Sequence, residues 1–283
     1  MEISSEDVSY FIEKLNRISE YDFTSYSEKS ITRRIEKVVT DNNMDAKSLI
    51  DKMEKSRDFL IKIVKDITVN TTELFRDPKI WHTIRYSILP VYKNKEKISI
   101  WHAGSSSGQE IYSMLILLYE MELFDKSDIY GTDINEDMVI EARKGIYKYR
   151  FNLDYLDNFN KVIRENPYNI DEYKDVPYEK YLEINKSNDT IKVLPFLLNK
   201  PEFRVHDLVK DRNIFNTEFD IIICRNVLIY FNNNLQNKVF DLFHKSLRPG
   251  GYLILGLHES MLGPISDKFD KKGLIYQKKL VTN

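Results

Sequence analysis

After Pro90, short apolar runs alternate with stretches of helical character. The apolar runs are KISIW, DIYGTD, EFRVHD, FDIIIC and GGYLILGL, with helices expected from Gln109, over NEDMVIEARKG and over LQNKVFDLFHKSL. This alternation is typical of a parallel sheet covered by helices, because each parallel crossover needs a long connection. The sequence therefore predicts a doubly wound α/β fold. The last apolar segment, LIYQKKL, is expected to be an edge strand that closes the sheet.

The chain before residue 70 has a different pattern. From Tyr10 to Ile67 the apolar residues recur at helical spacing, without strand alternation and without glycine. One stripe consists of Ile31, Ile35, Val38 and Val39, and another of Phe59, Leu60, Ile63, Val64 and Ile67. We therefore predict a small all-helical N-terminal domain over residues 1–69, followed by the α/β domain over residues 70–283.

The α/β rhythm breaks at about residues 150–200, where tyrosines and asparagines are frequent and periodicity is weak. We interpret this stretch as an insertion into the α/β domain. It is expected to be irregular and helical first, and then to form a small β element around TIKVLPFLL.

Composition excludes several classes of protein. A formal net charge of −2 argues against bulk nucleic-acid binding. No apolar run approaches the roughly 18 residues of a membrane span, and the N-terminus lacks the pattern of a signal peptide. The single cysteine, Cys224, excludes an internal disulfide and is interpreted as a buried strand residue, and the histidines lack ligand spacing. We expect a cytoplasmic protein without a bound metal and without membrane insertion.

The loop GSSSGQE, at 104–110, lies between an expected strand and an expected helix. In an open parallel sheet, ligands bind beyond the carboxyl ends of the strands. Gly104 and Gly108 would let the backbone approach a ligand, and Asp133, at the end of the next strand, would hold ribose hydroxyls. The loop and Asp133 indicate a nucleoside. They leave open a dinucleotide or S-adenosylmethionine, although the spacing is not that of a dinucleotide-binding loop.

Two further polar stretches narrow this choice. NTTELFRDP, at 70–78, places Asn70, Thr72 and Arg76 in the connector between the two regions. CRNVLIYF, at 224–231, follows the run FDIII, so that Arg225 and Asn226 are expected at the carboxyl edge of the sheet, where ligands bind.

Taken in order, these motifs resemble the CheR family of chemotaxis receptor glutamate methyltransferases. The family patterns N-x-T-x-F-F-R, A-G-x-S-x-G-E-E-x-Y-S and C-R-N-V-x-I-Y-F correspond to NTTELFR, AGSSSGQEIYS and CRNVLIYF, and TDINEDMVIEARKGIY also matches. The likeness covers nearly the whole chain, including RRIEKVV in the helical region, and is weakest between 150 and 200. It implies a helical N-terminal domain and a Rossmann-like, S-adenosylmethionine-dependent methyltransferase domain with an inserted small β-subdomain.

The resemblance also implies roles for individual residues. The implied cofactor-binding residues are Asn70, Thr72, Arg76, Gly104, Glu110, Asp133, Asp207, Leu208, Arg225 and Asn226. Arg76 and Tyr230 are the implied catalytic residues, with Tyr230 near the methyl group. Arg33, Arg34 and Lys37, expected to share the exposed side of a helix, would bind an acidic receptor helix.

The implied reaction is methyl transfer from S-adenosylmethionine to glutamate side chains of a membrane chemoreceptor's cytoplasmic helical region. A glutamate side chain, with a pKa of about 4.3, is already an anion at neutral pH, so no general base is required. Arg76 is expected to orient the carboxylate, because a guanidinium offers paired donors. The enzyme is expected to act as a monomer.

The sequence departs from the family pattern in places. Gln109 stands where the family has the first glutamate of a pair, which would remove a charge next to the cofactor, and His258 lies one residue late in LGLHES. These departures keep open an alternative, a non-catalytic or differently targeted S-adenosylmethionine-binding regulatory module. A nicotinamide oxidoreductase is disfavoured, because NTTELFR and CRNVLIYF have no place in one.

Overall fold

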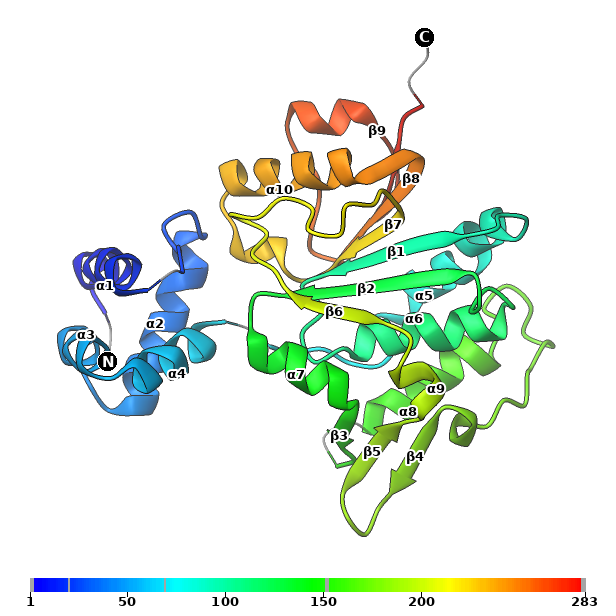
Figure 1. The fold of residues 1–283 in the computed structure, drawn as a ribbon, viewed down its shortest axis with the longest axis horizontal. Coiled ribbons are helices and arrows are strands. Elements are labelled where there is room, and N and C mark those ends of the chain that lie inside the picture. The colour runs from blue at the N-terminus through cyan, green and yellow to red at the C-terminus, as the bar shows by residue number, and fades with distance from the viewer. Residues whose placement is uncertain (1–2, 20, 69, 151–152, 281–283) are drawn as a thin grey trace. The chain divides into compact units, whose positions relative to one another are not determined.

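The computed structural model describes residues 3–19, 21–68, 70–150 and 153–280 (Figure 1). The chain forms two compact units. The smaller unit comprises Met1–Val69 and Val227–Phe240, and the larger unit comprises Asn70–Asn226 and Asp241–Asn283. Among the described residues, no helix combines the length and the apolar character needed to cross a bilayer.

The smaller unit begins with a group of helices, as the periodicity predicts. These are α1 (Ser5–Ile18), α2 (Glu28–Asn42), α3 (Ala46–Lys55) and α4 (Arg57–Ile67). The side chains of Ser4, Asp45 and Ser56 accept hydrogen bonds from the first turns of α1, α3 and α4, which satisfies backbone donors that a helix start leaves unpaired. Both predicted apolar stripes contribute to one buried core.

A segment from far along the chain also belongs to the smaller unit. It contains a short 3-10 helix, η5 (Leu228–Tyr230), and the first part of α10 (Asn233–Ser246). The backbone N–H of Ser27 donates to the carbonyl of Tyr230 at 2.8 Å, and the rings of Tyr26 and Phe231 meet edge to face at 5.1 Å. The smaller unit is therefore built from two separate stretches of the sequence.

The larger unit is organised around a sheet. Its strands are β1 (Ile98–Ala103), β2 (Ser127–Asp133), β6 (Glu202–Val205), β7 (Phe219–Cys224), β8 (Leu247–Leu255), β9 (Phe269–Lys272) and β10 (Ile275–Lys278). Within the described residues the strand order is β6-β2-β1-β7-β8-β10-β9, with parallel pairing from β6 to β8. Every residue of β1 and β7 is buried, as expected for strands covered on both faces. The predicted doubly wound α/β fold is confirmed.

The expectation for the last strand is wrong. LIYQKKL does form β10, but β10 pairs with both β8 and β9, so that β9 lies at the edge. Gly273 adopts a left-handed φ of 64° in the turn between β9 and β10. The chain after β8 thus returns as a hairpin, and β9, whose residues after Phe269 are exposed, takes the outer position.

The switch point of the sheet lies beside β1. From β1 the chain builds outward through β2 to β6, and then crosses back to β7 on the other side of β1. The helices α6 (Gln109–Glu120) and α7 (Glu136–Lys144) contact β2, and α7 also contacts β6 (Figure 1). The segments that follow β1 and β7 therefore emerge next to each other, which is where open α/β sheets bind ligands.

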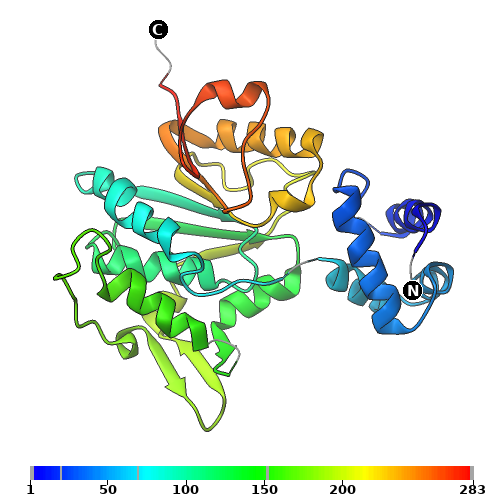
Figure 2. The ribbon, with the colours of Figure 1, turned by 180° about the vertical axis from the view of Figure 1, so that it is seen from behind.

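The predicted insertion consists of helical segments followed by a small sheet. It contains α8 (Leu153–Phe159), the π-helical turn η3 (Asn160–Arg164), β4 (Leu182–Asn185) and β5 (Thr190–Val193). β5 pairs with β4 and with β3 (Ile146–Lys148) in an antiparallel sheet, which lies beside α8 in both views (Figures 1 and 2). A helical part followed by a β element was expected, whereas β3 was not. Residues 151 and 152 of the predicted insertion lie outside the described residues.

Candidate functional site

The GSSSGQE loop curls tightly at the carboxyl end of β1. Gly104 and Gly108 have left-handed φ values of 78° and 88°, which favour glycine. A Cβ atom added at Gly108 would lie only 2.9 Å from the Cβ of Ala142 on α7, so any larger residue would push the loop away from this helix. Both glycines are therefore required by the conformation of the loop.

Asp133, at the end of β2, faces this loop. One carboxylate oxygen accepts the backbone N–H of Ser106 at 2.7 Å, and the other accepts that of Asn135 at 2.9 Å. Burial raises the pKa of Asp133, although these backbone hydrogen bonds oppose the shift. Each oxygen retains acceptor capacity, so the carboxylate can also accept hydroxyl groups of a ligand.

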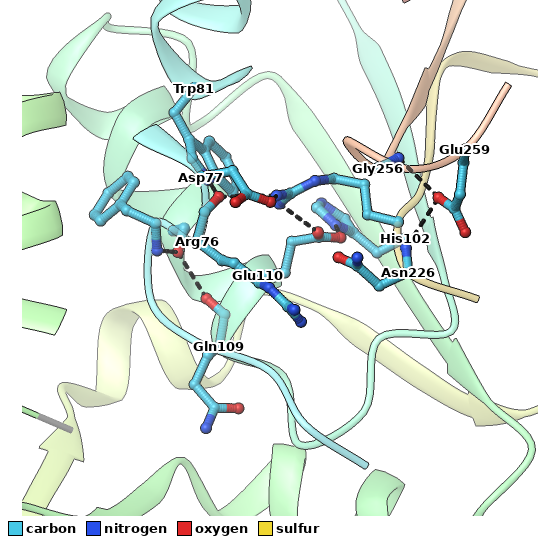
Figure 3. A network of polar contacts seen from close by, with 12 residues as sticks. Arg76, Asp77, Trp81, His102, Gln109, Glu110, Asn226, Gly256 and Glu259 are labelled. Atoms are coloured by element: carbon cyan, nitrogen blue, oxygen red, sulfur yellow. Dashed lines mark hydrogen bonds and ion pairs between the residues drawn. The ribbon is translucent and has the colours of Figure 1, made fainter. Parts of the chain in front are cut away.

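A buried ionic network joins the segments that follow β1 and β7 (Figure 3). Glu110, on the first turn of α6, accepts His102 Nδ1 at 2.9 Å and Arg225 Nη1 at 3.0 Å. Burial raises the pKa of Glu110, but the hydrogen bond of His102 and the charge of Arg225 outweigh burial, and the pKa lies below its usual value. Glu110 is therefore a carboxylate at neutral pH.

Arg225 also contacts the connector at residues 70–78, called the linker below, which carries Arg76. Its Nη2 donates to the carboxylate of Asp77 at 2.6 Å and to the backbone carbonyl of Arg76 at 2.8 Å. The indole N–H of Trp81 donates to the same carbonyl at 3.0 Å. Phe75 and Asp77 on either side have left-handed φ values of 52° and 58°, an unfavourable conformation that persists only where surrounding contacts impose it. The backbone at Arg76 is therefore held at a defined position.

The side chain of Arg76 is much less constrained than its backbone. Among the described residues its guanidinium makes one long hydrogen bond, of 3.4 Å, to the carbonyl of Thr71. The side chain is partly exposed and borders a mostly polar cavity of about 410 Å³. This cavity is lined by Glu73, Arg76, Asp77, Pro78, Asp154, Asp157, Asn158 and Lys161. Most of the donors of Arg76 are thus available to a ligand.

Asn226 and Glu259 connect the ends of β7 and β8. The backbone of Asn226 is left-handed, with a φ of 60°. The buried carboxylate of Glu259 accepts the N–H of Asn226 at 2.9 Å and the N–H of Gly256 at 2.7 Å (Figure 3). His258, in contrast, is exposed. The segment LGLHES therefore contributes the glutamate rather than the histidine to this edge of the sheet.

The remaining predicted cofactor residues come from the linker and from the end of β6. Asn70 and Thr72 lie on the linker, and Thr72 accepts a hydrogen bond at its carbonyl from Tyr155 at 3.1 Å. Asp207 and Leu208 follow His206, whose N–H donates to the carbonyl of Asp133 at 3.0 Å. The structure thus places Asp207 and Leu208 directly after a residue bonded to Asp133.

The predicted substrate-binding residues lie in the smaller unit, as does Tyr230. Arg33 and Lys37 are exposed on α2, one turn apart, and Lys37 pairs with Asp41. Arg34 was expected to share their exposed side, and this expectation is wrong. It is half-buried, and its guanidinium lies 5.9 Å from the ring centroid of Tyr230, because the helical rotation between adjacent residues turns it toward the buried side.

The role expected for Gln109 differs from the one that the structure indicates. Gln109 is buried and points away from Glu110 (Figure 3). Its amide accepts the hydroxyl of Ser107 at 2.8 Å and donates to the hydroxyl of Tyr155 at 3.1 Å. Gln109 therefore takes part in a hydrogen-bonded chain inside the protein.

Sequence reasoning missed several residues of the site. His102, Asp77 and Glu259 were not among the predicted site residues, although each bonds directly to one of them. The position of Asp77 directly after Arg76, inside the polar stretch NTTELFRDP, was the sequence feature that could have identified it as a site residue. Cys224 is fully buried, as expected, and burial together with the charges of Glu259 and Glu110 raises its pKa well above the usual value.

The residues at the switch point fit S-adenosylmethionine. The glycine loop leaves room for close approach of a ligand to the backbone, and Asp133 can accept ribose hydroxyls. Ser105, the loop residue after Gly104, has a buried hydroxyl without a hydrogen-bond partner among the described residues, which indicates a site that a ligand completes.

Comparison with known proteins agrees with this geometry. Residues 70–276 match the family model described as CheR methyltransferase, SAM binding domain. The chain is 34% identical over 235 residues to chemotaxis protein methyltransferase 1 of Vibrio cholerae, covering 80% of this chain and 78% of that protein. It is 29% identical over 262 residues to the chemotaxis protein methyltransferase of Listeria innocua, covering 92% of both chains. A Pseudomonas putida protein with the provisional name methyltransferase Cher3 is 31% identical over 266 residues, covering 93% of this chain and 92% of that protein.

These matches extend beyond short motifs and include the segments that build the switch point of the sheet. The cofactor is S-adenosylmethionine, and the chain belongs to the CheR family of methyltransferases.

Proposed function

We propose that this methyltransferase transfers a methyl group to glutamate side chains in the helical cytoplasmic region of a membrane chemoreceptor, forming glutamate 5-O-methyl esters. The names of the relatives from Vibrio cholerae and Listeria innocua support a role in chemotaxis. The observation that carries the proposal is the contrast between the backbone and the side chain of Arg76. Its backbone is held by Arg225 and Trp81, whereas its guanidinium is partly exposed beside a polar cavity.

The proposed chemistry places modest demands on the protein. S-adenosylmethionine, when bound, supplies a methyl group already activated by the sulfonium. An acceptor glutamate is ionised at neutral pH, so the site needs no residue to remove a proton. Its residues have to orient the carboxylate and exclude water. Arg76 would orient the carboxylate through paired donors, and Asp133, with Glu110, would hold the cofactor.

Arg76 should position the acceptor without binding it too tightly. The negative charge of the carboxylate is neutralised as the ester forms, so strong pairing with a guanidinium would stabilise the ground state more than the transition state. The neighbouring carboxylates of Glu73, Asp77, Asp154 and Asp157 line the same cavity. Their charges would moderate the attraction between Arg76 and an acceptor carboxylate.

The acceptor surface is proposed to include α2. Arg33 and Lys37 present exposed positive charges, which would favour an acidic receptor helix. Tyr230 is proposed to lie near the transferred methyl group, as its motif implies. The enzyme is proposed to work as a cytoplasmic monomer.

The decisive experiment uses the purified full-length chain, radiolabelled S-adenosylmethionine and candidate chemoreceptors. Glutamate methyl esters release methanol in mild alkali, whereas N-methyl groups do not. We expect base-labile label on the receptor. Only alkali-stable label would contradict glutamate esterification. Cofactor binding by calorimetry without label on any candidate would instead support the regulatory, non-catalytic alternative.

A further inference from the structure

Tyr155 lies on α8, in the part of the insertion for which no motif indicates a role. Its side chain is buried, and its hydroxyl makes contact with two separate segments. The hydroxyl accepts the amide Nε2 of Gln109 at 3.1 Å and donates to the carbonyl of Thr72 at 3.1 Å. Tyr155 therefore joins the cofactor loop to the linker that carries Asn70, Thr72 and Arg76.

The hydrogen bonds around Tyr155 have a fixed direction. The hydroxyl of Ser107 donates to Gln109 Oε1, Gln109 Nε2 donates to Tyr155, and Tyr155 donates to Thr72. A phenol has a single proton, and here the carbonyl of Thr72 receives it. The group that faces Tyr155 from position 109 must then be a donor. Glutamine meets this requirement, and an ionised glutamate does not.

Other residues of α8 contact the same linker. The rings of Phe159 and Phe75 meet edge to face, with centroids 6.0 Å apart, and Asn158 Nδ2 lies 3.5 Å from the carbonyl of Leu74. Burial raises the pKa of Tyr155 to about 12, so its hydroxyl keeps its proton throughout the physiological range. Tyr155 therefore remains able to donate to the carbonyl of Thr72 over this range.

We propose that Tyr155 is a positioning residue for S-adenosylmethionine binding, acting through the carbonyl of Thr72 and the amide of Gln109. The proposal rests on the role proposed for the linker residues in the cofactor site. Without the tyrosine hydroxyl, the linker would populate its binding conformation less often. The apparent affinity for the cofactor falls in proportion to that population.

The test compares Tyr155→Phe with the wild-type full-length protein. We expect the dissociation constant for S-adenosylmethionine, measured by calorimetry, to rise about three- to tenfold, as expected for one lost hydrogen bond. Amide hydrogen exchange across residues 70–77 should become faster in the free protein. An unchanged dissociation constant with unchanged exchange would overturn the proposal.

The matched control is Tyr92→Phe, in the same unit. It also removes one buried phenol hydroxyl, which donates to the carbonyl of Asp220 at 3.0 Å, near the start of β7. We expect a comparable fall in the melting temperature, with cofactor affinity and linker exchange unchanged. Equal effects of the two variants on affinity would show that Tyr155 acts only through general stability, and would refute a positioning role.

Gln109→Glu provides a second test that keeps the tyrosine. The new carboxylate would accept the hydrogen bond of the phenol hydroxyl, which would no longer donate to the carbonyl of Thr72, so exchange across residues 70–77 should again become faster. If Tyr155→Phe does not fold, wild-type exchange in Gln109→Glu overturns the proposal. Binding and exchange need no acceptor, so a failure to methylate receptors would contradict the proposed function and leave this test intact.

Discussion

At the residue scale, Asp133 combines two tasks. It fixes the loop through the N–H of Ser106, and it retains acceptor capacity for a ligand. We expect Asp133→Ala to weaken S-adenosylmethionine binding by about 2 kcal/mol, on the order of thirtyfold, because a charged acceptor is lost. Calorimetry measures this directly. The control is Asp189→Ala, which removes a carboxylate bonded to Arg150 next to the small sheet and should bind the cofactor normally.

Glu110 should determine part of the pH dependence of stability. Its pKa is lowered in the folded protein, so its contribution is present above the unfolded value of about 4.3 and is lost as the pH falls through the lower folded value. We expect Glu110→Gln to reduce the free energy of unfolding by about 3 kcal/mol at neutral pH, because Arg225 is buried and would keep, among the described residues, only Asp77 as an ionic partner. The difference between wild type and variant, measured by urea denaturation, should shrink below about pH 4.

Glu120→Gln is the matched control for this variant. Glu120 pairs with Lys180 at 2.8 Å and with Tyr181, and although burial opposes the shift, these partners lower its pKa as well. The stability lost in Glu120→Gln should show the same pH dependence, and the variant should bind the cofactor as tightly as the wild type. A pH-independent difference for Glu110→Gln would show that the lost stability does not come from the charge.

Short motifs in the sequence singled out residues such as Asn226 and Arg76, whose roles in the cofactor site stay predictions. His102 and Glu259 were not singled out in this way, because their roles depend on contacts with residues distant in the sequence. For Gln109, the motif predicted a position next to the cofactor. Its hydrogen bond to Tyr155 could not be predicted, because Tyr155 lies in an insertion without periodicity. A motif shows which residue types stand at neighbouring positions of the sequence. The hydrogen-bond partners that orient their side chains come from distant positions, so they are known only from the fold.

At the element scale, α2 presents two kinds of basic residue. Arg33 and Lys37 are exposed, whereas Arg34 is half-buried over Tyr230. We expect Arg33→Glu combined with Lys37→Glu to lower receptor methylation on the order of tenfold, by repulsion from an acidic partner. Cofactor affinity and melting temperature should change little, since the pair of Lys37 with Asp41 is exposed. A filter assay of base-labile label measures the rate.

A charge-matched control separates this face from the rest of the unit. Lys47→Glu with Lys55→Glu makes the same change of charge at exposed positions of α3. Methylation by this variant should stay close to the wild-type rate. An equal loss in both double variants would mean that overall charge matters, and that α2 is not the acceptor surface.

Elements with strong patterns were predictable. The strands buried on both faces, β1 and β7, are continuous apolar runs, and the helices α2 and α4 have clear stripes. β9 was missed because only Phe269 of its residues is buried, so FDKK has no strand pattern. Its absence from the prediction made β10 look like the edge of the sheet. Whether an edge segment forms a strand depends largely on the strand that it pairs with, so its own sequence is a weak predictor.

At the scale of the whole molecule, the chain contributes to the smaller unit twice. Val227–Phe240 follows directly after Asn226, the last residue of the larger unit's first stretch. CRNVLIYF therefore spans both units, with Arg225 and Asn226 in the larger and Tyr230 in the smaller. The helices before residue 69 and the segment after Asn226 consequently depend on each other through the contacts of residues 25–27 with residues 230–232.

This dependence predicts the effect of removing residues 1–69. The segment Val227–Phe240 would lose the hydrogen bonds from Ser27 to Tyr230 and from Asn232 to Ser25, and the contact of Tyr26 with Phe231. We expect a chain of residues 70–283 to show fast amide exchange over 227–240, while β1 and β7, whose residues are all buried, stay protected.

Tyr26→Ala in the full-length chain tests the same dependence without truncation. It removes the aromatic contacts with Phe23 and Phe231 and should cost about 2 kcal/mol in the smaller unit. Exchange should rise over 227–232, and the rest of the chain should keep its protection. Tyr10→Ala, which removes a partly buried tyrosine of the same core from α1, is the control and should leave 227–232 protected. Wild-type protection of 227–232 in both Tyr26→Ala and the truncated chain would mean that this segment holds its structure without the N-terminal helices, and that residue 70 is the true start of an independent domain.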